Sequence, residues 1–362
     1  MIVVRVIIGV LGGLVALATL GSAIRTVVVP RGEQSFLANA TVLSLRQVFN
    51  WVANRRGDWN KAEAVRARFA PVALMTFPFV WACGVILGCS GVFWALGVRP
   101  YQDAVVLSGS SLTTLGFRST NDFPTLAVEI AEGIVGLGLV ALLISFLPTI
   151  YAAFSKRETA VAKWDLRSMG VYSAVGPAAV LLRRHQVGSL DTMMHTWYEW
   201  EDWFAEIEES HTSFPILVYF RSQVPQRSWI TCAGSVLDSA SLYSSVLAVP
   251  TDPRAQLMIR TGTLSLRRIC DYFGFEYDPD PSPDDPISIT QAEFDDVYVQ
   301  FQSSGMPVVA DQQQAWRDFA GWRVNYDRPL LSLASWLGAP KATWCSDRPI
   351  EVRRPRIFHR LR

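Results

Sequence analysis

The chain alternates between long apolar stretches and stretches rich in charge. Three segments, residues 6–24, 69–98 and 133–155, contain no Asp, Glu, Lys or Arg. A helix of about 20 apolar residues crosses the hydrocarbon core of a bilayer. The pattern therefore predicts an all-α membrane protein with three transmembrane helices, followed from residue 156 by a polar and mainly helical domain.

The charges between these segments predict the orientation. Residues 30–70 contain seven basic and three acidic residues, whereas residues 99–132 contain two basic and four acidic residues. Basic loops stay in the cytoplasm, so we expect the N-terminus outside and the C-terminal domain in the cytoplasm. The expected location is a bacterial plasma membrane. The alternative for the first segment is a secretory signal cleaved near Ala23, but cleavage would export the basic loop.

A polar segment, SSLTTLGF at residues 110–117, separates the second apolar stretch from the third. A cation that enters a membrane exchanges its water shell for oxygens, and inward-facing backbone carbonyls can supply them. Glycine permits the backbone angles that such a segment requires. Residues 101–112 can form a short helix before it. The alternative is a simple turn between a short helix and a membrane span.

Residues 71–157 resemble the pore module of the potassium channel superfamily, in which SSLTTLGF corresponds to a T-x-T-T-V-G-Y selectivity filter. The resemblance implies an outer helix at 71–97, a re-entrant pore helix at 101–112, a filter at 113–118 and an inner helix at 127–153. It also implies an oligomer, most simply a homotetramer. The whole chain, including residues 200–213, resembles a group of actinobacterial channel-like membrane proteins, which implies no activity. The filter residues would be Thr113, Thr114, Leu115, Gly116 and Phe117.

The resemblance stops at Arg118, where the family usually has a second glycine. A ring of arginines at the outer mouth would repel cations unless a carboxylate neutralised it. Asp122 and Glu129 are the candidates at this mouth, and Glu129 or Glu132 could brace Arg118 or simply face water. Arg118 also supports the alternative function, a membrane-anchored scaffold or signalling protein that does not conduct.

The predicted inner helix contains residues that allow bending. Gly136 and Gly138 are small and flexible, and Pro148 removes a helix hydrogen bond. These residues are a candidate gating hinge, although they are also common in ordinary membrane helices. This inner helix completes the predicted pore module at 71–155. The segments before the module are a first transmembrane helix at 1–29 and a basic linker at 30–70.

The domain at 156–340 carries apolar stripes at helical spacing, such as Trp197, Trp200 and Phe204, and these predict a packed core. Thr290 and Glu293 form a predicted capping box. The basic tail at 341–362, with seven basic and two acidic residues, is expected to stay mobile or to touch anionic lipid.

The sequence predicts no enzyme, metal site or cofactor. Glu208 and His211 have the spacing of a di-iron helix, but the second such pair is missing, so a solvated acidic face is the simpler interpretation. Residues 156–340 contain 15 basic and 23 acidic residues, which disfavours nucleic acid as a partner. We expect a passive channel subunit for monovalent cations, with potassium as the favoured ion and membrane lipid as a partner.

Overall fold

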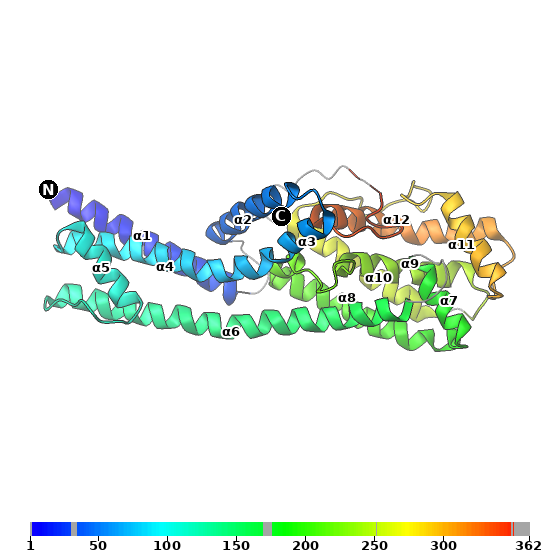
Figure 1. Cartoon of the computed structure of the whole chain (residues 1–362), viewed down its shortest axis with the longest axis horizontal. Helices are drawn as coiled ribbons and strands as arrows, with labels where there is room; N and C mark the ends of the chain where they lie inside the picture. The colour runs from blue at the N-terminus through cyan, green and yellow to red at the C-terminus, as the bar shows by residue number, and fades with distance from the viewer. Residues whose placement is uncertain (1, 30–34, 169–175, 251, 349, 351–362) are drawn as a thin grey trace. The chain divides into compact units, whose positions relative to one another are not determined.

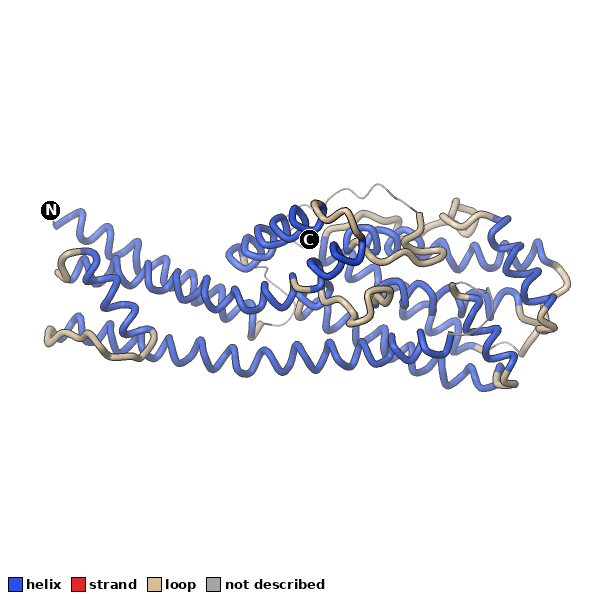
Figure 2. Tube along the Cα trace, viewed as in Figure 1, coloured by secondary structure: helices blue, strands red, loops and turns tan. Residues whose placement is uncertain are grey.

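The computed structural model describes residues 2–29, 35–168, 176–250, 252–348 and 350. This part of the chain is helical and contains no β-strand, only an isolated antiparallel bridge between Leu247 and Val308 (Figure 2). The predicted all-α class is confirmed. The chain divides into two compact units, Met1–Ala152 and Ala153–Arg362.

Six helices begin in the N-terminal unit, and Figure 1 labels them. Three candidate membrane spans are confirmed, since α1, α4 and α6 are each long and apolar enough to cross a bilayer. The bounds are α1 Ile2–Val27, α2 Phe36–Asn54, α3 Trp59–Ala67, α4 Phe69–Leu96, α5 Tyr101–Leu112 and α6 Phe123–Ser168.

Helix α1 packs along α4 through small residues. A Cβ built on Gly12 would lie 2.4 Å from the carbonyl oxygen of Gly88, and one built on Gly88 would lie 2.6 Å from that of Gly12. Such contact between helix backbones is how helices associate in lipid, where no hydrophobic force drives them together.

The predicted basic linker at 30–70 folds largely as helix. Residues 30–34 lie outside the described residues, and α2, α3 and the start of α4 follow. Asp58 caps α3 by accepting hydrogen bonds from the backbone N–H groups of Asn60 and Lys61. The linker is therefore a pair of helices that contact each other.

The predicted bounds of the inner helix, 127–153, are wrong, because α6 begins at Phe123 and continues to Ser168. The prediction ended the helix where the apolar stretch ended. Residues 154–168 are rich in Ala, Lys, Arg and Glu, whose helix propensity is at least as high as that of apolar residues. In the C-terminal unit, Val161 and Trp164 of this extension are buried in the core.

The C-terminal unit is a bundle in which α8, α9, α10 and α12 pack on one another. Nearly every residue of α9 is buried, and the predicted stripe of Trp197, Trp200 and Phe204 is confirmed as core. The capping box of Thr290 and Glu293 is also confirmed. The helices are α7 Ala178–Gln186, α8 Met193–Ser213, α9 Trp229–Val246, α10 Pro253–Phe273, α11 Gln291–Ser303 and α12 Gln312–Leu337, with short 3-10 turns η1 Leu190–Thr192 and η2 Pro215–Tyr219.

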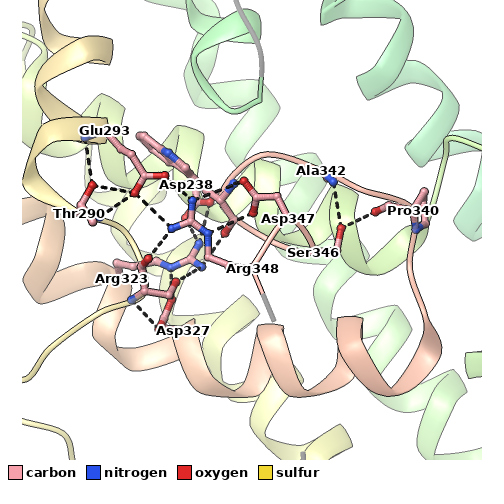
Figure 3. A network of polar contacts seen from close by, with 12 residues as sticks. Asp238, Thr290, Glu293, Arg323, Asp327, Pro340, Ala342, Ser346, Asp347 and Arg348 are labelled. Carbon is pink, nitrogen blue, oxygen red and sulfur yellow. Dashed lines mark hydrogen bonds and ion pairs between the residues drawn. The ribbon is translucent and has the colours of Figure 1, made fainter. Parts of the chain in front are cut away.

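The expectation of a mobile tail from residue 341 is wrong for residues 341–348. Trp344 and Cys345 are buried, and the buried guanidinium of Arg323 donates a hydrogen bond to the Trp344 carbonyl at 2.8 Å. Arg348 pairs with Glu293 at 2.6 Å (Figure 3). Apolar side chains inside a basic segment can still fill a core. Residues 349 and 351–362 of the predicted tail lie outside the described residues.

Candidate pore segment

Helix α5 has the bounds expected for residues 101–112 and lies between α4 and α6 (Figure 1). The Ser108 hydroxyl contacts both neighbours, at 3.3 Å from the carbonyl of Ile86 in α4 and 2.5 Å from the carboxyl of Glu132 in α6. The C-terminal end of α5 meets α6 at Gly136, where a Cβ would lie only 1.9 Å from the Leu112 carbonyl oxygen. Three helices thus support the segment that follows Leu112.

The chain turns back directly after α5. The backbone N–H of Thr114 donates to the Ser111 carbonyl at 3.0 Å, and the N–H of Leu115 donates to the Ser110 carbonyl at 3.1 Å. Two residues of the turn have positive φ, 57° at Thr114 and 66° at Gly116. Glycine adopts this conformation readily, whereas a β-branched threonine does so only when its surroundings hold it there.

These hydrogen bonds determine where the carbonyl groups point. In a trans peptide the C=O and N–H lie on opposite sides. Because the N–H groups of residues 114–116 donate back to α5, the carbonyls of Thr113, Thr114 and Leu115 point away from it. None of the carbonyl oxygens of residues 113–117 accepts a hydrogen bond within the described part of the chain. The segment therefore offers a row of free backbone acceptors.

Residues 113–117 are exposed within one protomer. Leu115 is 71% exposed and Phe117 is 64% exposed. Large apolar side chains with so much exposure indicate a surface that lipid or another chain covers.

Arg118 is held back against α5 and is paired with a different carboxylate from those predicted. Its guanidinium lies 2.5 Å from Asp103, in the first turn of α5. Its backbone N–H donates to the Ser110 hydroxyl at 3.1 Å, and that hydroxyl contacts the Arg118 carbonyl at 3.2 Å. Asp103 and Ser110 are seven residues apart and so share one face of α5. This spacing, visible in the sequence, places both Arg118 partners on the same side of the helix.

The two predicted mouth carboxylates have other tasks. Asp122 caps α6, since its carboxylate accepts hydrogen bonds from the backbone N–H of Thr125 at 3.4 Å and from its hydroxyl at 2.9 Å. Glu129 is buried and accepts hydrogen bonds from the Ser119 hydroxyl at 2.8 Å and from Thr120 at 3.0 and 3.2 Å. The idea that Glu129 or Glu132 braces Arg118 or faces water is wrong, because both are buried and pair elsewhere.

The candidate hinge residues lie in a continuous α6. Gly136 contacts the end of α5, while a Cβ on Gly138 would meet nothing within 4 Å. Pro148 lies inside the helix without ending it. The three residues therefore differ in environment, and Gly136 has a packing role that does not depend on bending.

Comparisons with known proteins identify no relative. No family model, curated protein or solved structure matches this chain.

The acidic helix α8 does not assemble a metal centre among the described residues. Glu208 pairs with Arg268 at 2.9 Å, whereas His211 is buried against Arg157. The Arg157 guanidinium donates to Nε2 of His211 at 3.1 Å, so the imidazole proton is on Nδ1, 3.1 Å from the Ser210 hydroxyl. Both ring nitrogens of a neutral histidine are satisfied.

This arrangement predicts acid sensitivity of the C-terminal unit. Burial and the Arg157 charge lower the pKa of His211 well below its usual value of 6.5. The unfolded chain then binds this proton more readily than the folded chain. The free energy of unfolding therefore keeps its full value above pH 6.5 and decreases as the pH falls from 6.5 towards the folded-state pKa, by at most about 1.4 kcal/mol per pH unit. We expect the melting temperature of the full chain to fall less steeply between about pH 7 and pH 5 in His211→Gln than in the native protein.

His195 provides the matched control, because its side chain is 79% exposed and pairs with Glu199 on the surface. His195→Gln should keep the native dependence of melting temperature on pH. The same slope in all three proteins would contradict the assignment.

Proposed function

We propose that this chain is a subunit of an oligomeric membrane pore that conducts monovalent cations passively, with potassium as the favoured ion. The observation that carries the proposal is the set of free carbonyls at residues 113–117, which accept no hydrogen bond from the described residues, with those of Thr113, Thr114 and Leu115 pointing away from α5. Backbone carbonyls of this kind can replace the water shell of a cation.

The location of the row supports the same function. Non-helical backbone is tolerated at membrane depth only where it is buried in protein or lines water. Leu112, the last residue of α5, contacts Gly136, which is thirteen residues into α6. Gly136 is the fourth residue of the charge-free stretch 133–155, so the contact lies within the predicted membrane span. In the proposal, α5 is a re-entrant pore helix and residues 113–117 are the filter.

One such segment cannot surround an ion, so the proposal includes an assembly, most simply a homotetramer. The exposed Leu115 and Phe117 would then contact neighbouring subunits. The proposed location is a bacterial plasma membrane, and the charge distribution supports an orientation with the N-terminus outside and the C-terminal unit in the cytoplasm. Membrane lipid would cover the exposed apolar faces of α1, α4 and α6.

A non-conducting scaffold is the second candidate, and Arg118 is the observation that favours it. Its guanidinium places positive charge beside the proposed filter, where cations would be repelled. Asp103 offsets this charge, since the two side chains form an ion pair at 2.5 Å. That pair supports conduction over the scaffold.

Flux through proteoliposomes tests the proposal. We expect the native chain to conduct potassium and Gly116→Ala to lose flux by at least about tenfold, because alanine at positive φ is strained by about 1–2 kcal/mol in every subunit and 1.4 kcal/mol corresponds to a factor of ten. Gly13→Ala in α1 is the control, since its Cβ would meet nothing within 4 Å. It should conduct like the native chain.

The number of subunits is measured on the same samples. A folded, oligomeric native chain without potassium or sodium flux would contradict the channel proposal and favour the scaffold. A chain that is monomeric in the bilayer could not conduct by this route.

A further inference from the structure

Glu132 is a buried carboxyl group that pairs with no cationic side chain in the part of the chain that the structure describes. It lies in α6 and is 3% exposed. Its Oε1 is 2.5 Å from the Ser108 hydroxyl of α5, while its buried Oε2 has no hydrogen-bond partner among the described residues. The titratable groups that face it are the Cys89 thiol of α4, which is a weak hydrogen-bond donor to the carboxyl, and the Glu129 carboxyl of α6. Neither carries positive charge.

The hydroxyl of Ser108 has two acceptors in reach but only one hydrogen. It lies 2.5 Å from Glu132 and 3.3 Å from the carbonyl of Ile86. If Glu132 were ionised, the Ser108 hydroxyl would donate its one hydrogen to the carboxylate. No hydrogen would then lie between the hydroxyl and the Ile86 carbonyl. If Oε1 carries a proton, Glu132 donates to Ser108 and Ser108 donates to Ile86. Only the protonated form satisfies both contacts, in one chain from α6 through α5 to α4.

The energetics favour the same state. A buried ionised group without a partner costs several kcal/mol, even after the protein relaxes. The unpartnered Oε2 would carry part of that charge. In the neutral acid, Oε2 is only a carbonyl oxygen that lacks one hydrogen bond, which costs about 1–3 kcal/mol.

We propose that Glu132 is a neutral carboxylic acid that positions α5 by donating a hydrogen bond to Ser108. The protonation state stands on the contacts alone. Its consequence for conduction rests on the proposed function, because α5 supports the carbonyls of residues 113–117. Glu132 is thus a positioning residue that acts on the filter through Ser108.

Glu129 offers a matched comparison three residues earlier on α6. Its carboxylate accepts hydrogen bonds from the Ser119 hydroxyl and from both the hydroxyl and backbone N–H of Thr120. All three groups can donate, so Glu129 needs no proton of its own. The contacts of Glu129 are thus all satisfied by donors from its partners, whereas the contacts of Glu132 and Ser108 require a proton on Glu132.

Infrared spectroscopy of the purified full chain tests the assignment. We expect the native protein to show a C=O stretch of a protonated carboxylic acid, with a shift in D2O, and Glu132→Gln to lose that band. Glutamine keeps the shape of the side chain and an N–H that can donate to Ser108, so the variant should fold. Glu129→Gln should retain the band.

The spectra are recorded in potassium buffer and in choline buffer without alkali cations. If the native protein lacks the Glu132 band in potassium buffer, the proposal is overturned. A band that then appears in choline buffer would identify Glu132 as a carboxylate that binds the cation. Loss of the band in Glu129→Gln alone overturns it as well. The spectra require no flux, so a chain that fails to conduct but shows the Glu132 band would disprove the channel and leave this inference intact.

Discussion

Replacing Gly136 with alanine should abolish cation flux and lower the melting temperature of the full chain. The new Cβ would lie 1.9 Å from the Leu112 carbonyl oxygen, which is backbone and cannot rotate aside. Overpacking of this kind typically costs about 1–3 kcal/mol. Relief requires α5 to move from α6, and α5 supports the carbonyls of residues 113–117. Flux in proteoliposomes and thermal unfolding in detergent measure the two effects.

Gly138→Ala separates packing from bending. A Cβ at Gly138 would meet nothing within 4 Å, so this variant should retain native flux and stability. If α6 gates by flexing at its glycines, both variants should impair flux to a similar degree. Equal effects would contradict the packing explanation and favour the hinge hypothesis.

Replacing Asp238 with alanine should destabilise the C-terminal unit by about 3–5 kcal/mol, because it leaves a buried arginine without its main counter-charge. The guanidinium of Arg323 is fully buried and donates to both carboxylate oxygens of Asp238, at 2.6 and 2.7 Å. Burial acts to lower the pKa of Arg323, whereas the Asp238 and Asp327 carboxylates raise it. In the variant Asp327 still accepts a hydrogen bond from Arg323 at 2.7 Å, and an arginine side chain keeps its charge in a protein, so the buried charge remains. Denaturant unfolding followed by tryptophan fluorescence measures the loss.

Glu206→Ala provides the control for this experiment. Glu206 pairs with Lys156 on the surface, where their side chains are 42% and 69% exposed. Exposed pairs contribute about 0–1 kcal/mol. A destabilisation of Asp238→Ala no larger than that of Glu206→Ala would show that the buried network in Figure 3 is not important for stability.

The sequence predicted α4 and α5 closely, whereas α6 continues fifteen residues beyond its predicted end at residue 153. The bounds of α5 follow from Pro100 before it and from the glycine-containing turn after it, and both are local signals. The positive φ of Gly116 agrees with its residue type. That of Thr114 could not be predicted, because a β-branched residue disfavours this conformation and only the hydrogen bonds back to α5 impose it.

The errors concern contacts between residues that are distant in sequence. Arg118 pairs with Asp103, fifteen residues earlier, because the chain returns alongside α5. The nearer Asp122 looked more suitable but is engaged as a helix cap. At the C-terminal end, net charge suggested a mobile tail, while Trp344 and Cys345 were the apolar signal for burial.

The anchoring of residues 341–348 has a consequence for biosynthesis. Arg323 needs the carbonyl of Trp344, and Glu293 in α11 needs Arg348, so the bundle is complete only when these late residues are available. Domains usually fold as units while the ribosome is still extending the chain. Here α8, α9, α10 and α12 leave the ribosome before Trp344 and Arg348 do. Until then the buried Arg323 lacks its hydrogen bond to the Trp344 carbonyl. A message truncated after codon 340 would yield a chain fixed in that unfinished state, a natural substrate for quality-control proteases.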